Sequence, residues 1–159
     1  MKEDQSLREH VLYLLRGGGA HANFDSATKG LPTELRGKRP KGAEHSPWEI
    51  LEHMRIAQSD ILDFSRDAKH VSPEWPAGYW PKTPAPPSNA AWTRSISEFN
   101  TDLEAMCGLV EAKSTDLFAR IPHGSGQTIL LEALLVADHN AYHLGELVLV
   151  RRLLGAWGG

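Results

Sequence analysis

Apolar residues recur at intervals of three and four along four stretches of the chain, which is the pattern of amphipathic α-helices. The first stretch begins near Gln5, the second runs from about Pro47 to Ala68, the third begins near Ser88, and the last runs from about Thr128 to Leu154. No stretch shows the alternation typical of a β-strand. The pattern predicts an all-α protein, an antiparallel four-helix bundle with room for a short fifth helix in one connection. Because the chain has 159 residues, a typical size for one domain, we expect a single domain over 1–159.

Glycine and proline mark the connections between these helices. Three consecutive glycines, Gly17–Gly19, weaken or kink the first helix, and residues 20–29 are expected to resume it. Residues 31–45 read as a loop. The long segment 71–87 between the second and third helices holds six of the ten prolines together with Trp75, Tyr79 and Trp80. Aromatic residues in so long a loop favour packing on the domain, either as a pocket wall or lid, or as plugs of the core.

The second helix has a clear start. Ser46 suits the N-cap, Pro47 suits the first helical position, and Glu49 completes a capping box three residues after the serine. Counting from this start, His53 lies one and a half to two turns into the helix, on or near the face that carries the apolar residues. The sequence therefore predicts an inward-facing histidine in this helix.

Two further histidines, His139 and His143, lie one turn apart in the apolar last helix. Residues i and i+4 share a helix face, so the two imidazoles can converge on one point. Together with His53 they suggest a three-histidine metal site that bridges two helices and keeps open coordination positions, as catalytic zinc sites do. Imidazole ligands also suit nickel, iron or copper. The alternative is that all three are hydrogen-bonded core residues.

Carboxylates near the three histidines are candidates for orienting the imidazole rings, and the alternative for each is a solvated surface carboxylate. Metal-bound histidines usually pass their second N–H to such a group, and the candidates are Asp60, Asp138 and Glu146. The pair is not the HExxH motif of zinc proteases, because Asn140 occupies the position of the catalytic glutamate. The other histidines are left out of the predicted site: His10, His21, His45, His70 and His123.

The composition of the chain excludes some classes of binding partner. The formal net charge of −3 argues against a nucleic-acid surface, which needs a basic face. No apolar run is long enough for a membrane span, and the polar N-terminus does not resemble a signal peptide. The lone cysteine, Cys107, fits a reducing compartment. We therefore expect a cytoplasmic protein with no nucleic-acid or membrane partner.

Two segments, His45–Met54 and Ala137–Leu147, resemble the two signature helices of the DinB/YfiT-like superfamily. The resemblance implies an up-down-down-up four-helix bundle that forms a homodimer. It also implies a divalent metal ion, nickel or zinc, bound through His53, His139 and His143. One departure concerns Glu146, since the family often has glutamine at this position, and the extra carboxylate changes the charge around the metal.

The resemblance also implies a class of function. Characterised relatives include thiol-dependent transferases and isomerases that use low-molecular-weight thiols, and some hydrolase-like members. The leading prediction is a metal-dependent enzyme acting on a small molecule, similar to a thiol S-transferase, with pocket candidates Trp75, Tyr79, Trp80 and Tyr142. One alternative is a metal-dependent hydrolase that uses metal-bound water. The other is a non-catalytic, metal-binding or stress-related dimeric bundle.

Overall fold

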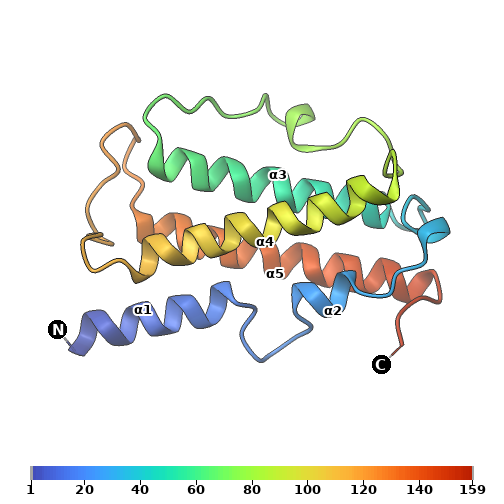
Figure 1. Ribbon diagram of the computed structural model, residues 1–159, viewed down its shortest axis with the longest axis horizontal. Coiled ribbons are helices and arrows are strands. Elements are labelled where there is room, and N and C mark those ends of the chain that lie inside the picture. Colours follow the sequence, from blue (N-terminus) through green and yellow to red (C-terminus); the bar gives the residue numbers. More distant parts are fainter. Residues whose placement is uncertain (1, 159) are drawn as a thin grey trace.

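The computed structural model describes residues 2–158 as a helical bundle (Figure 1). Its helices are α1 (Lys2–Leu15), α2 (Phe24–Thr28), α3 (Pro47–Arg66), α4 (Asn89–Glu111) and α5 (Ile129–Leu153). Within these residues there is no β-strand, and the nearest approach to one is an isolated bridge between Arg120 and Thr128. The predicted all-α class is confirmed. None of the helices in this range has the length and apolarity needed to cross a membrane.

The four long helices run in two directions. In Figure 1, α3 and α4 run one way, and α1 and α5 run the other. Accordingly, Trp48 at the start of α3 lies 6.4 Å from Trp92 at the start of α4, measured between ring centroids. Arg8 in α1 donates a hydrogen bond of 2.6 Å to the carbonyl of Val110 at the end of α4. Because α3 and α4 are parallel, the connection 67–88 must return along the bundle, and it does so beside α3.

The start of α3 matches the capping box expected from the sequence. The Ser46 hydroxyl accepts a hydrogen bond of 3.2 Å from the Glu49 backbone N–H. The Glu49 carboxylate in turn accepts one of 2.9 Å from the Ser46 backbone N–H. Two otherwise unpaired backbone donors are satisfied in this way, and the position of the first turn is set. That position places His53 on the buried face of α3.

Helix α5 is the centre of the packing, because it contacts α1, α2, α3 and α4. Two buried apolar clusters meet along it. One surrounds the ends of α3, α4 and α5 near α2 and includes Phe24, Ile50, Leu51, Met54, Phe99, Leu144 and Leu147. The other lies toward α1 and includes Val11, Leu15, Leu62, Met106, Val110, Ala133 and Val136.

The segment after α1 differs from the expected continuation of that helix. Gly17 and Gly18 have φ angles of +91° and +54°, a region that side-chain-bearing residues avoid, so the chain turns there. The following helix, α2, is restricted to five residues, and the Asn23 side chain caps it by accepting a hydrogen bond of 2.9 Å from the Ser26 N–H.

Candidate metal centre

Three histidines from two helices meet in the bundle. His53 of α3 and His139 and His143 of α5 each offer a ring nitrogen, and these three atoms lie within 4.8 Å of one another. The His53 ring centroid is 5.0 Å from that of His139 and 4.5 Å from that of His143. His53 and His143 are buried, and His139 is partly buried. The three predicted ligand residues are therefore brought together in one place.

For His53 and His143, a hydrogen bond determines which ring nitrogen faces the centre. The Nδ1 of His53 lies 2.9 Å from the Tyr79 backbone carbonyl, which can only accept, so Nδ1 carries the proton and Nε2 is left free. The Nδ1 of His143 lies 2.9 Å from Oε2 of Glu146, and this again leaves Nε2 free. Carbonyl and carboxylate acceptors of this kind orient histidines that bind metal ions.

The donor set fits a divalent ion. The Nε2 atoms of His53 and His139 are 3.2 Å apart. With zinc–nitrogen bonds of about 2.0–2.1 Å, two nitrogen ligands of a tetrahedral ion lie about 3.3 Å apart. Burial is the largest cause that lowers the pKa of His139, to about 4, and burial also lowers the pKa of His53. Both imidazoles are therefore neutral at pH 7, which is the form that binds metal ions.

Glu146 stands beside the centre, where it links two histidines. One carboxylate oxygen is bonded to His143, and the other lies 3.4 Å from Nδ1 of His45. The hydrogen bond with His143 is the largest cause that lowers the pKa of Glu146. The carboxylate is ionised at neutral pH and offsets part of the positive charge of a bound cation.

Asp60 lies one step further from the centre than the sequence suggests. Among residues 2–158, no hydrogen bond joins Asp60 to any of the three histidines. Its Oδ1 lies 2.6 Å from Nε2 of His70, and its Oδ2 accepts a hydrogen bond of 2.7 Å from the Tyr79 hydroxyl. Asp60 thus anchors the loop residue whose carbonyl orients His53.

Asp138 does not take the predicted orienting role. Its side chain is exposed on α5 and makes no hydrogen bond to the three histidines in the described part of the chain. The physical reason is its place on the helix, about 100° around the axis from His139, because each residue advances by that angle.

Of the four aromatic candidates for the pocket, only Trp80 places its ring directly against the centre. The Trp80 indole stacks on His53 at 4.0 Å and 3° between ring planes, and its other face stacks on His45 at 3.9 Å. Tyr79 contributes its backbone carbonyl. Tyr142 meets His143 edge-on but is 73% exposed, and Trp75 is equally exposed and contacts Tyr79. Trp80 therefore forms an aromatic wall of the centre.

Sequence reasoning missed two neighbours, His45 and His70. His45 directly precedes the N-cap of the helix that carries His53, and this closeness in sequence was the available signal. No comparable signal existed for His70, whose partner Asp60 lies ten residues away across the end of α3.

Comparison with known proteins places the chain in a family. The model of the DinB superfamily matches residues 18–147, a span that includes α2 to α5 up to Leu147 and all three histidines. No curated protein and no solved structure matches the chain. The chain belongs to the DinB superfamily, and the family identified by resemblance is confirmed.

Proposed function

We propose that this member of the DinB superfamily binds a zinc or nickel ion through His53, His139 and His143, and that it is a metal-dependent enzyme acting on a small molecule. The observation that carries the proposal is the meeting of three ring nitrogens, with two of the rings held by an acceptor on their far side. A divalent ion in this place supplies Lewis acidity and lowers the pKa of a water or thiol that binds it.

The reaction we favour is transfer of a low-molecular-weight thiol to an electrophilic small molecule. Three neutral imidazoles leave the positive charge of the ion largely uncompensated, which favours an anionic partner such as a thiolate. Trp80 stacks on both His53 and His45, so a sulfur beside His53 would meet the edge of the indole, where favourable sulfur–aromatic contacts often form. In this proposal Trp80 helps to place the sulfur, and Glu146 holds His143.

Hydrolysis by a bound water is the weaker candidate. A hydrolase of this kind gains from a free carboxylate that acts as a general base. Both oxygens of Glu146 face histidines, and both oxygens of Asp60 are engaged by His70 and Tyr79. Neither of these two carboxylates is therefore free to act as that general base.

We also infer that the protein is a homodimer. Helix α5 carries exposed apolar residues at positions that fall within about 40° of one another around the helix, at 100° per residue. They are Leu131, Leu135, Tyr142, Leu149 and Leu153. A stripe of this kind along a whole helix supports an interface with a second copy. A stable dimer that binds metal but lacks enzyme activity is the remaining alternative.

Metal analysis of tag-free protein, followed by a thiol-consumption assay, tests the proposal. We expect near-stoichiometric zinc or nickel in the wild type, its loss in His143→Ala, and its retention in His10→Ala, which changes an exposed histidine of α1. Consumption of electrophiles that depends on both thiol and metal supports the transferase. Thiol-independent ester or amide hydrolysis supports the hydrolase instead, and loaded protein without either activity supports the non-catalytic dimer. Wild type that takes up neither metal contradicts the whole proposal.

A further inference from the structure

Two buried polar atoms on neighbouring residues of α5 complement each other. Among residues 2–158, three buried side-chain atoms lack a hydrogen bond of ordinary geometry, and two of them are Nδ1 of His139 and Oδ1 of Asn140. A ring nitrogen donates when it carries the proton, whereas an amide oxygen can only accept. Native proteins leave few buried polar atoms unpaired, because each one costs free energy. The two atoms therefore have the chemistry of a donor and its acceptor.

The amide of Asn140 is held in one orientation. Asn140 is 7% exposed, and its Nδ2 donates a hydrogen bond of 2.8 Å to Oε1 of Gln58 in α3. Gln58 donates from Nε2 to the Phe99 carbonyl of α4 at 2.7 Å. Because that carbonyl can only accept, Gln58 must turn its NH₂ group toward it and its oxygen toward Asn140. Asn140 must then turn its own NH₂ group toward Gln58, and its Oδ1 is left as an acceptor.

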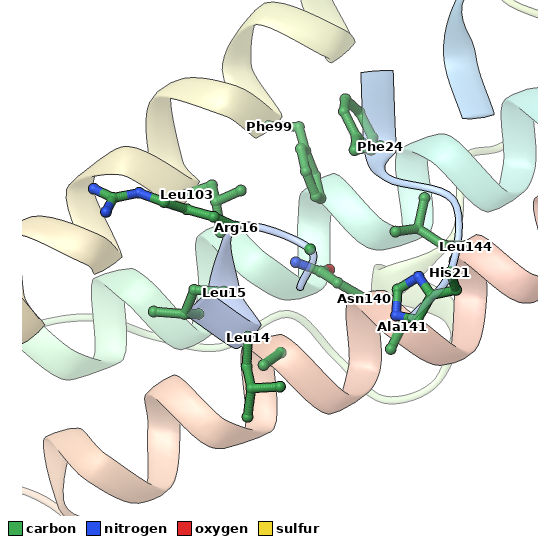
Figure 2. Close-up of a pocket in the computed structure, with 12 residues that line it drawn as sticks. Leu14, Leu15, Arg16, His21, Phe24, Phe99, Leu103, Asn140, Ala141 and Leu144 are labelled. Atoms are coloured by element: carbon green, nitrogen blue, oxygen red, sulfur yellow. The ribbon is translucent and has the colours of Figure 1, made fainter. Parts of the chain in front are cut away.

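The place of this oxygen points to His139 as its partner. In Figure 2 the Asn140 side chain extends from α5 into the interior of the bundle, with the amide at its end. Both Oδ1 of Asn140 and Nδ1 of His139 are shielded from solvent, so bulk water satisfies neither. Burial is the largest cause that lowers the pKa of His139, to about 4, whereas a hydrogen bond with the Asn140 side chain raises it. An acceptor beside the ring has this effect, because it favours the protonated form.

The neutral His139 ring has two ways to place its single proton. On Nδ1, the proton is donated to Asn140, and Nε2 is left free to bind an ion. On Nε2, it is donated to Nε2 of His53, which lies 3.2 Å away and is free because the proton of His53 is on Nδ1. The second arrangement occupies a ligand atom of both histidines. An acceptor fixed beside Nδ1 favours the first arrangement, which is the one that a metal centre needs.

We propose that Asn140 is a positioning residue of the candidate metal centre. Its Oδ1 keeps the proton of His139 on Nδ1, and Gln58 acts through Asn140 by preventing the amide from turning over. Each of the three converging rings then has an acceptor on its far side. The proposal rests on the proposed binding of a metal ion by the three histidines. It also gives a role to the residue that stands in the place of the catalytic glutamate of zinc proteases, because a neutral amide can hold a ligand but cannot act as a general base.

Nitrogen NMR of the histidine side chains in metal-free protein at pH 7 tests the proposal. The ¹⁵N chemical shift distinguishes a ring nitrogen that carries a proton from one that does not, and His139→Gln identifies the signals of His139 by their loss. We expect the wild type to carry the proton of His139 on Nδ1. In Gln58→Leu the Asn140 amide is free to turn over, so part of the His139 population is expected to move its proton to Nε2.

Zinc affinity, measured by competition with a chelator, is the second readout. Asn140→Leu removes the acceptor, and loss of such a partner typically weakens metal binding about ten-fold or more. Gln58→Leu is expected to weaken it less, because the amide still presents its oxygen to His139 part of the time. Leu62→Ala is the control, since it shortens a buried side chain of α3 one turn from Gln58 and takes no part in the hydrogen-bond chain. It is expected to lower stability and to leave the tautomer of His139 and the zinc affinity unchanged.

Several results overturn the proposal. They are a wild type with the proton of His139 on Nε2, a folded Gln58→Leu with an unchanged tautomer, and a folded Asn140→Leu that binds zinc no more weakly than Leu62→Ala. The first result needs only the wild type, so it decides the matter even if the variants do not fold. Wild type that carries the proton on Nδ1 but takes up no zinc contradicts the metal centre and not the hydrogen bond to Asn140, so the two proposals fail in different ways.

Discussion

Two neighbouring sets of buried polar side chains on α5 are held in different ways. At the candidate metal centre, ring nitrogens of three histidines converge, and the far sides of two rings are held by a carbonyl and a carboxylate. Asn140, the residue after His139, instead donates a hydrogen bond of 2.8 Å to Gln58 of α3, which donates one of 2.7 Å to the Phe99 carbonyl of α4. Convergent ring nitrogens suit a cation, whereas a chain of hydrogen bonds from helix to helix fixes the packing of the bundle.

The largest expected effect is stabilisation by metal ions bound at the three histidines. A ligand present at 1,000 times its dissociation constant raises the free energy of unfolding by about 4 kcal/mol when it binds only the folded state. We expect zinc to stabilise the wild type to this order and to leave His139→Ala nearly unaffected, because that variant loses one of the three converging nitrogens. Urea unfolding with and without zinc measures the difference.

His123→Ala is the control for this experiment, because His123 is exposed, its ring is bonded to the Phe64 carbonyl, and it is not one of the three converging histidines. Its response to zinc should equal that of the wild type. Equal stabilisation of His139→Ala by zinc would contradict the three-histidine site.

The second effect concerns the hydrogen-bond chain that positions Asn140. Gln58→Leu removes the donor to the Phe99 carbonyl and the acceptor of the Asn140 amide, so two buried groups each lose a hydrogen bond. We expect a loss of about 2–4 kcal/mol in the free energy of unfolding. Gln58→Leu combined with Asn140→Leu should cost less than the sum of the single changes, because the partners disappear together.

Gln5→Leu serves as the matched control, since Gln5 is an exposed residue of α1 bonded to Glu9. Surface changes of this kind alter stability by no more than about 0.5 kcal/mol. A similarly small effect of Gln58→Leu in urea unfolding would show that the chain of hydrogen bonds does not hold Asn140 in place.

Much of the fold follows from local patterns. Helical spacing of apolar residues predicts all four long helices, and the sequence Ser46-Pro47-x-Glu49 predicts the start of α3 to the residue. The segment 20–29 follows less directly from the sequence, because it depends on the left-handed turn at Gly17 and Gly18 and on the Asn23 cap rather than on apolar spacing. Such a short helix has little periodicity to read.

In the candidate site, too, some residues follow from local sequence patterns and others depend on tertiary packing. His139 and His143 can be placed together from their spacing alone, and His53 follows from the helix start. The contacts of Trp80 with His45 and His53 depend on the path of the connection 67–88, which has no helical or strand period. The chain of hydrogen bonds from Asn140 through Gln58 to the Phe99 carbonyl depends on how α3, α4 and α5 pack together, so no local pattern indicates it.

A smaller effect is expected from the carboxylate that orients His143. Glu146→Ala removes the acceptor of the His143 Nδ1 proton, and loss of such partners typically weakens metal binding about ten-fold or more. Asp138→Ala is the matched control on the same helix, since its side chain is exposed and not bonded to the histidines. Competition with a chelator measures both affinities. Equal losses in the two variants would indicate a general charge effect rather than orientation of His143.

The smallest effect is the pH dependence of the metal-free chain. Burial is the largest cause that lowers the pKa of His139 to about 4 in the folded state, and His143 and His53 lower it further by repulsion. In the unfolded chain the pKa of histidine is about 6.5, so the unfolded state binds more protons between these values. The stability contributed by neutral His139 is therefore complete above about pH 6.5 and is lost as the pH falls toward 4.

At pH 5, with a chelator present, we expect the wild type to lose on the order of 1 kcal/mol relative to pH 7, because solvent screens part of the full effect. His139→Gln removes the titrating group, so its stability should change less over this range, while His10→Gln should follow the wild type because His10 is exposed. Urea unfolding at several pH values measures these slopes. A His139→Gln slope equal to that of the wild type would show that His139 is not desolvated against α3. The contrast between a desolvated histidine cluster and the hydrogen-bond chain of Asn140 and Gln58 would then fail at the histidine cluster.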